Sequence, residues 1–93
     1  MRIHRLKTYH EYFVAQTLSI KQFEVRYNDR TYQVGDVLIL REWNNDNGYI
    51  GVAIYLRVIY VLEEFEGLKD GYVVLGTEPL TKEEIEEVVR NGY

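Results

Sequence analysis

The chain has 93 residues, a net charge of −4 and no cysteine, so it has room for one domain with one core and excludes disulfide bonds and thiolate metal sites. The acidic balance argues against broad, non-specific binding to nucleic acid. The N-terminus lacks the apolar run of a signal peptide, and no apolar segment approaches the roughly 20 residues that span a bilayer, so we expect a cytoplasmic protein without membrane contact.

A strand and a helix are predicted at the start of the chain. Apolar and polar residues alternate over 3–7, which predicts a strand. Thr8 is followed three residues later by Glu11, the pattern of a capping box, in which each of the two residues satisfies a free backbone N–H of a helix start. We therefore expect a helix from about residue 9 to residue 18.

The middle of the chain predicts two further strands and a hairpin. Residues 22–27 alternate and predict a second strand. The loop over 28–36 contains Asn, Asp and Gly, which favour turns. Residues 37–43 begin with a continuous apolar run, which predicts a strand buried on both faces. Residues 44–48, of sequence NNDNG, predict a tight hairpin turn, because these residues tolerate a positive φ.

A long strand is predicted over 49–62, and we expect it to be bent. Gly51, near its start, indicates either a β-bulge or a close approach by a ligand. Residues 63–71 are polar and predict a loop or a single helical turn. A closing strand is predicted over 72–78, and Pro79 ends it because proline lacks a backbone N–H.

The C-terminal segment predicts a second helix that begins at a second capping box, formed by Thr81 and Glu84. We expect this helix to dock on the sheet or to fray. The elements together predict a β-rich α+β domain, a small mixed β-barrel of five to six strands with one early helix and one C-terminal helix. We place the domain at residues 1–78 and a helical extension at 79–93.

Charge is unevenly distributed along the sequence. Residues 1–41 contain seven Lys or Arg and four Asp or Glu, a balance of +3, whereas residues 42–93 contain four and eleven, a balance of −7. The basic half could form a positive cleft on an acidic protein. The alternative is that the asymmetry disappears when the two halves interleave in the fold.

The densest group of charges lies on the second predicted strand and the loop after it: Lys21, Glu24, Arg26, Asp29 and Arg30. Side chains alternate along a strand, so Glu24 and Arg26 share one face, and Phe23 and Val25 share the other. We expect the apolar pair to face the core and the charged pair to face a cleft. We expect Lys21 to reach over the same opening, and Asp29 and Arg30 to frame its rim.

Such a cleft would suit an anionic or planar ligand. Lys and Arg attract phosphate or carboxylate, and Arg can hold either with two bonds. Glu24 could accept a hydrogen bond from a base or sugar, or fix Arg26 in place. Tyr49 or Tyr72 could stack on a base. The structural alternative is that Glu24 and Arg26 form an ordinary surface pair worth less than about 1 kcal/mol, and that Asp29 is a turn residue.

Two runs of the sequence carry a family resemblance: K-x-x-E-x-R-x-x-D-R, from Lys21 to Arg30, and V-G-D-V-L-I-L-R-E, from Val34 to Glu42. Over roughly residues 4–78 the chain resembles the bacterial and phage family called domain of unknown function 3850, which belongs with the ASCH domains in the PUA-like superfamily. The resemblance implies a PUA-like β-barrel with the first helix beside a cleft.

In ASCH domains the motif G-x-K-x-x-E-x-R lines that cleft. Lys21, Glu24 and Arg26 match the motif, whereas Ser19 stands where the family often has glycine. The resemblance therefore favours a module that binds RNA or a nucleotide. Its ligand would contact eight residues: Lys7, Lys21, Glu24, Arg26, Asp29, Arg30, Tyr49 and Tyr72.

Two alternatives stay open. Some ASCH domains remove acyl groups from modified cytidine nucleosides, which makes Lys21 and Glu24 candidate catalytic residues of a small amidohydrolase. The hydrolase pattern has Thr at the position of Glu24, so the covalent route would lack its hydroxyl. The other alternative is a protein-interaction accessory of phage or mobile-element origin.

We expect neither a cofactor nor a metal. The two histidines, His4 and His10, have no dedicated metal-ligand spacing and are more typical of surface or capping residues. The sequence also has no G-x-S-x-G motif and no phosphate-binding loop.

Overall fold

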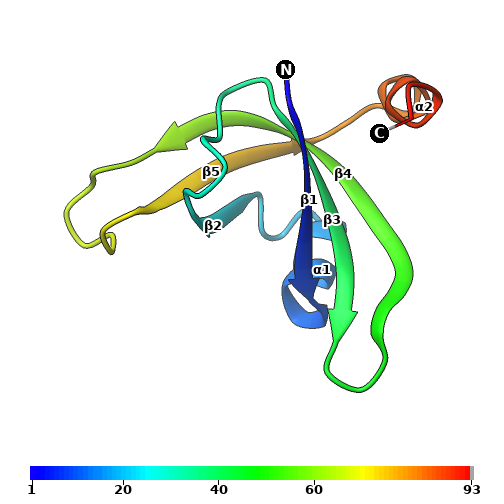
Figure 1. Ribbon diagram of the computed structural model, residues 1–93, viewed down its shortest axis with the longest axis horizontal. Helices are drawn as coiled ribbons and strands as arrows, with labels where there is room; N and C mark the ends of the chain where they lie inside the picture. The colour runs from blue at the N-terminus through cyan, green and yellow to red at the C-terminus, as the bar shows by residue number, and fades with distance from the viewer. Residues whose placement is uncertain (93) are drawn as a thin grey trace.

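The computed structural model describes residues 1–92 and consists of one five-stranded sheet and two helices (Figure 1). The elements in chain order are β1 (Ile3–Tyr9), α1 (His10–Thr17), β2 (Phe23–Tyr27), β3 (Val37–Asn44), β4 (Gly48–Leu62), β5 (Tyr72–Pro79) and α2 (Lys82–Arg90). The strand order in the sheet is β1-β3-β4-β5-β2. The strand β1 pairs in parallel with β3, and the other three pairings are antiparallel.

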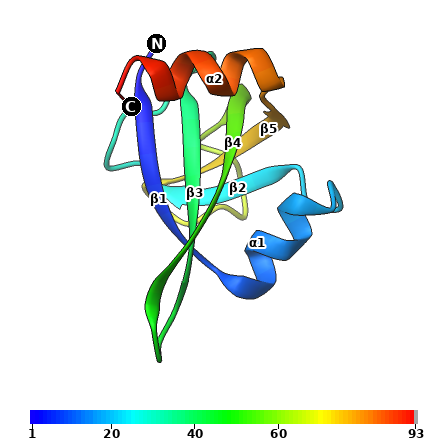
Figure 2. The same cartoon turned by 90° about the vertical axis from the view of Figure 1, so that its right-hand side faces the viewer.

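The sheet curls into a half-barrel, so the predicted α+β class with a partly closed sheet is confirmed (Figures 1 and 2). The two edge strands, β1 and β2, approach each other across the open side. The Arg26 guanidinium on β2 bridges them by donating from Nη1 to the Lys7 carbonyl, 3.2 Å away, and from Nη2 to Thr8 Oγ1, also 3.2 Å away. A side chain therefore spans the seam that backbone pairing would close in a full barrel.

The core occupies the concave side of the sheet. Nine buried residues form it: Leu6, Phe13, Tyr32, Leu38, Leu40, Leu56, Val58, Val73 and Leu75. The strand β3 is buried on both faces, as predicted, because Leu38 and Leu40 point into this core while Val37 and Ile39 pack on the opposite side. Phe13 brings α1 against the concave side, next to the open seam.

The helix α2 lies across the convex face, over the ends of β1, β3 and β4 (Figure 2). Leu80 and Val88 pack there against Val37 and Ile39. Thr81 caps the helix and forms the predicted capping box with Glu84, which is confirmed in both directions. No helix within residues 1–92 is long and apolar enough to cross a bilayer.

The first predicted capping box is wrong. β1 stays paired with β3 as far as Tyr9, opposite Trp43, so Thr8 lies inside a strand with its side chain buried. Its hydroxyl donates to the Leu6 carbonyl and accepts from Arg26. The N-cap of α1 is Tyr9, which makes no side-chain capping bond. Strand pairing outweighed the local helix-start pattern, and α1 spans His10–Thr17 rather than 9–18.

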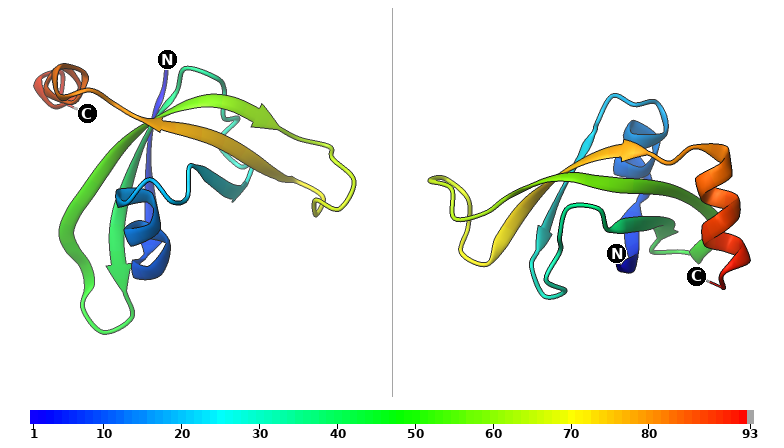
Figure 3. Two further views of the ribbon diagram at one scale, coloured as in Figure 1. Left: turned by 180° about the vertical axis from the view of Figure 1, so that it is seen from behind. Right: turned by 90° about the horizontal axis from the view of Figure 1, so that it is seen from above.

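A β-bulge lies at the predicted glycine of β4. Arg41 pairs with Ala53 and Trp43 with Tyr49, so two steps along β3 face four steps along β4. Gly51 lies in the extra segment with a φ of 87°, a conformation that other residues rarely adopt. The long β4 then continues to its pairing with β5, and the loop joining these two strands projects to the side opposite α2 (Figure 3).

His4 is buried on the concave side of β1, so the prediction of a surface or capping residue is wrong for it. Its Nε2 lies 2.9 Å from Asp36 Oδ2. The same carboxylate accepts from the backbone N–H groups of Arg2 and Gln33. Asp36 thus connects the start of β1 to the loop that precedes β3.

Candidate functional site

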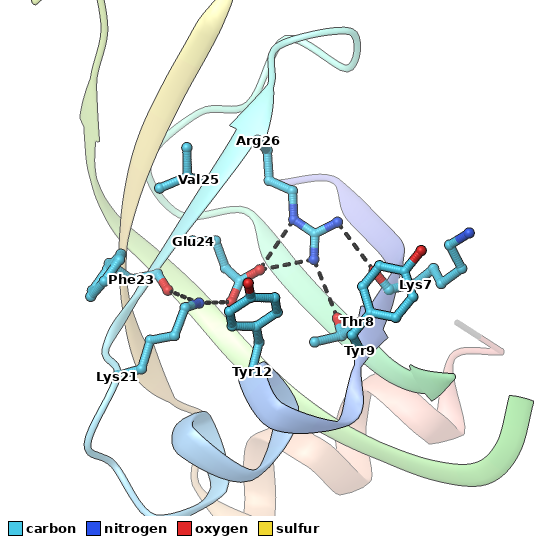
Figure 4. A pocket seen from close by; sticks show the side chains of 9 residues that line it. All are labelled: Lys7, Thr8, Tyr9, Tyr12, Lys21, Phe23, Glu24, Val25 and Arg26. Carbon is cyan, nitrogen blue, oxygen red and sulfur yellow. Dashed lines mark hydrogen bonds and ion pairs between the residues drawn. The ribbon is translucent and has the colours of Figure 1, made fainter. Parts of the chain in front are cut away.

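A pocket of about 590 Å³ lies in the seam between the two edge strands (Figure 4). Nine residues line it, from β1, α1, β2 and the turn before β2: Lys7, Thr8, Tyr9, Tyr12, Lys21, Phe23, Glu24, Val25 and Arg26. Its volume lies within the roughly 300–1,000 Å³ of small-molecule sites. The half-barrel therefore leaves a ligand-sized cavity where its sheet does not close.

Glu24 lies at the centre of the pocket, and only 3% of its surface is exposed. Oε1 accepts from Arg26 Nε at 3.1 Å and Nη2 at 2.8 Å. Oε2 accepts from Lys21 Nζ at 2.5 Å and Gln16 Nε2 at 2.9 Å. A carboxylate has about four acceptor sites, so all of those of Glu24 are used within the protein. Its role is to hold the two cations in place.

The cations keep a small donor capacity for a ligand. Lys21 uses one N–H on Glu24 and another on the Phe23 carbonyl, which leaves one of its three. Arg26 uses four of its five N–H groups, on Glu24, Thr8 and the Lys7 carbonyl, and keeps one on Nη1. Lys21, Arg26 and Glu24 together carry a net charge of +1, and Lys7 adds a third cation to the lining, so the pocket favours an acceptor-rich, anionic group.

Glu24 is ionised in the folded protein. Burial by itself would raise the pKa of its carboxyl. The hydrogen bonds from Lys21 and Gln16, with the charges of Lys21 and Arg26, outweigh burial and hold that pKa below the usual 4.5. A carboxylate with a lowered pKa and no free acceptor site is a weak general base. This argues against a general-base role for Glu24, a candidate catalytic residue in the amidohydrolase alternative.

Stability is expected to fall at acidic pH because of Glu24 and Asp36. The pKa of Asp36 is also lowered from its usual 3.8: burial raises it, but the bonds from His4 and from the Arg2 and Gln33 backbone outweigh burial. Groups whose folded-state pKa is depressed stabilise the fold above their unfolded pKa, and that stabilisation is lost as pH falls through the folded value. The free energy of unfolding, measured in urea by circular dichroism, should therefore decline from about pH 4.5 downward. A Glu24→Gln variant should show a shallower decline, and an unchanged slope would contradict this assignment.

The prediction for the apolar pair of β2 is wrong, because Phe23 and Val25 are 44% and 50% exposed instead of facing the core. Glu24 and Arg26 share the other face and line the pocket, where Glu24 is buried. The physical reason is that β2 is an edge strand whose inner face meets the polar Gln16, Lys21 and Thr8 rather than apolar residues. The four bonds to Glu24 offset the cost of burying its charge.

The structure brings together four of the eight predicted ligand residues. Lys7, Lys21, Glu24 and Arg26 line the pocket. Asp29 and Arg30 do not: they lie on the surface after β2, with Arg30 Nε 3.9 Å from Asp29 Oδ1. The guanidinium carbon of Arg41 lies over the Tyr49 ring, 3.8 Å from the ring centre, and Tyr72 packs edge-on against Tyr27.

Sequence reasoning missed five of the nine lining residues (Thr8, Tyr9, Tyr12, Phe23 and Val25) and also Gln16, which contacts Glu24 from outside the lining. Gln16 donates to Glu24 from the last turn of α1. Tyr12, one turn earlier in α1, forms part of the pocket wall, and half of its surface is exposed. Thr8 supplies an acceptor for Arg26 from β1. A spacing of four residues in a predicted helix could have placed Gln16 and Tyr12 on one face, but no local pattern connects either of them to β2.

The second histidine lies at the end of the seam. His10 Nδ1 is bonded to Glu42 Oε2, and its side chain is 70% exposed. Among residues 1–92 no group of three or more His, Cys, Asp or Glu side chains is arranged to hold a metal ion.

Comparison with known proteins gives one family. A family model described as "Domain of unknown function (DUF3850)" matches residues 3–77, which include every residue of the pocket and end before α2. An "Uncharacterized 12.9 kDa protein in GpA 3'region" of Escherichia phage P2 is 35% identical over 74 residues, 80% of this chain. The match covers 66% of the phage protein, so this chain corresponds to just under two thirds of that relative.

Proposed function

Because this chain belongs to the DUF3850 family, a domain of unknown function whose matched region contains the whole pocket, we propose that the pocket binds a nucleotide or one nucleotide unit of an RNA. The observation that carries the proposal is the saturated Glu24, which holds Lys21 and Arg26 as a preorganised cationic pair with one free N–H each. Preorganised donors favour an anion because their ordering cost is already met in the fold.

The aromatic walls suit the planar part of a nucleotide. Lys21 Nζ lies 5.0 Å from the centre of the Phe23 ring and 6.0 Å from that of Tyr12. Phe23 and Tyr12 are each about half exposed, so each can offer a ring face to a base. A phosphate on the cations and a base on a ring would use the pocket's two kinds of surface together.

The resemblance of Lys21, Glu24 and Arg26 to the ASCH motif supports the same conclusion. We place the chain in the PUA-like superfamily on that basis, with residues 1–78 as the ligand-binding domain. The half-barrel and the position of α1 beside the seam are consistent with this placement.

Calorimetric titration tests the proposal with the four ribonucleoside monophosphates and the matching nucleosides. We expect any nucleotide that binds to do so more tightly than the matching nucleoside, because its phosphate contacts Lys21 and Arg26. Arg26→Gln or Lys21→Gln should weaken binding by about ten-fold or more, the effect of one charge-assisted hydrogen bond. Lys69→Gln, in the exposed loop after β4, is the matched control and should bind as the wild type does.

Thermal melts of each variant check that the fold is intact at the titration temperature. The absence of binding by all four nucleotides at millimolar concentration would contradict the proposal. Release of acetate from acetylcytidine by the wild type, lost in Lys21→Gln, would replace it with the hydrolase alternative.

A further inference from the structure

The convex face of β1, β3 and β4, beyond the end of α2, combines cations and aromatic rings in register. Arg5, Lys7 and Tyr9 alternate outward on β1, because His4, Leu6 and Thr8 point inward. Pairing places Lys7 beside Arg41 and Tyr9 beside Trp43, and Trp43 beside Tyr49 of β4. We call this set the basic–aromatic face: Arg5, Lys7, Tyr9, Arg41, Trp43 and Tyr49.

This face is positive on a protein whose net charge is −4. Three of its six residues are cations, and none of the six is acidic. The three nearest acids in sequence lie off the strand positions of the face. Glu42 is buried on the opposite side of β3, where its Oε2 meets His10, Glu11 lies in the first turn of α1, and Asp46 lies in the hairpin turn. The charge asymmetry between the halves of the sequence therefore survives folding as a localised patch.

The cations lie over the rings. Lys7 Nζ is 4.4 Å from the centre of the Trp43 ring, and the Arg41 guanidinium carbon is 3.8 Å from that of Tyr49. Tyr9 packs edge-on against Trp43, with 5.6 Å between ring centres. Rings interleaved with cations are the surface on which single-stranded nucleic acids bind, bases on the rings and phosphates on the cations.

The basic–aromatic face adjoins the pocket. Lys7 and Tyr9 belong to both, because β1 is the edge strand between the seam and the convex face. In Figure 4 the Lys7 amine points away from Glu24, while the Lys7 carbonyl accepts from Arg26. A nucleic-acid strand that leaves the pocket past Tyr9 would reach Trp43 and Arg41 next.

We propose that the basic–aromatic face binds the nucleotides that follow the one held in the pocket, so that the ligand is a single-stranded oligonucleotide. This inference rests on the proposed function of the pocket and extends it. The negative charge of the rest of the protein limits contact to a short stretch of the strand rather than a long track.

A length series of oligoadenylates, from the mononucleotide to the octanucleotide, tests the proposal by fluorescence. Trp43 is the only tryptophan of the chain and lies on the face but not among the pocket residues. We expect the octanucleotide to bind at least about five-fold more tightly than AMP, because stacking on even one further ring contributes about 1–3 kcal/mol. It should also quench Trp43 more strongly than saturating AMP does. Oligodeoxyadenylates in parallel show whether the ribose hydroxyl matters.

A double variant, Arg5→Gln with Arg41→Gln, separates the face from the pocket. We expect it to leave AMP binding unchanged, to weaken octanucleotide binding, and to lower the slope of log affinity against log salt by about 1.4, since each lost phosphate contact on a single strand removes about 0.7. The matched control is Lys69→Gln with Arg90→Gln, which removes the same charge from exposed positions away from the face. Its slope should stay within about 0.3 of the wild-type value.

The outcomes distinguish the two proposals. Arg26-dependent binding of AMP, with no gain for the octanucleotide and no quenching of Trp43, would overturn the face and leave the pocket. Octanucleotide binding that depends on Arg5 and Arg41, with no binding of AMP and no effect of Arg26→Gln, would overturn the pocket and leave the face. If octanucleotide binding weakened equally in the double variant and in its control, the binding would reflect general charge attraction, and the proposal for the basic–aromatic face would be overturned.

Discussion

Glu24→Ala is expected to lower the free energy of unfolding by about 3 kcal/mol, because removing one member of a buried ionic network leaves its partners uncompensated. The loss lies at the lower end of the roughly 3–5 kcal/mol for such changes. The reason is that the Lys21 and Arg26 side chains are already 17% and 23% exposed and can turn to water. Gln16, which also donates to the Phe23 carbonyl, keeps one of its two bonds.

Thermal and urea unfolding measure this effect. A loss of about 3 kcal/mol corresponds to a drop in melting temperature of about 12 °C or more in a domain of this size. Glu66→Ala, in the exposed loop between β4 and β5, is the matched control and should change stability by less than about 0.5 kcal/mol. If Glu24→Ala lost no more than this control, Glu24 would not hold the site together, and the cationic pair would not be preorganised.

Asp36→Asn is expected to cost about 2 kcal/mol, since the amide keeps the shape of the side chain but only one of its two acceptor oxygens. Asp36 Oδ1 accepts from the Arg2 N–H, and Oδ2 accepts from the Gln33 N–H and meets His4. In either amide orientation, at least one buried donor would face an NH₂ group. Such an unsatisfied group costs about 1–3 kcal/mol.

Urea unfolding of Asp36→Asn should be compared with that of Asp46→Asn, the same chemical change at an exposed turn position. We expect the control to match the wild type. Equal stabilities of the two variants would mean that the His4–Asp36 cluster is no more stabilising than a surface pair. Neither residue lines the pocket, so nucleotide binding by the Asp36 variant should be preserved at temperatures where it is folded.

The strands were predictable from sequence because their information is local. Alternation in β1 and β2, the apolar run of β3 and the turn residues of 44–48 each indicate a strand or a hairpin on their own. The second capping box was correct for the same reason: Thr81 begins a helix that follows a proline and has no competing strand. Thr8 carries the same pattern, but the pairing of Tyr9 with Trp43 is more than thirty residues distant in sequence and overrides it.

The site was predictable only in part. The motif placed Lys21, Glu24 and Arg26 together, because three charges within six residues on one strand and its entry cannot lie far apart. Their burial was not predictable, since it depends on Gln16 and Thr8 from other elements. Proximity in sequence also misled: Asp29 and Arg30 are near the motif but turn away from it, whereas Tyr9 is far from it in sequence and lines the same pocket.

The place of β2 in the sheet determines when the pocket can form during synthesis. Within the described residues β2 pairs only with β5. Residues 23–27 therefore have no strand partner until residues 72–76 have been synthesised. A nascent chain that has completed β4 can already pair β1, β3 and β4. We expect β2 to pair with β5 last, because bringing these two distant strands together costs chain entropy before any contact between them is gained. Chains truncated before β5 should therefore expose Glu24 and its cations to water, and ligand binding should begin only with the final strand.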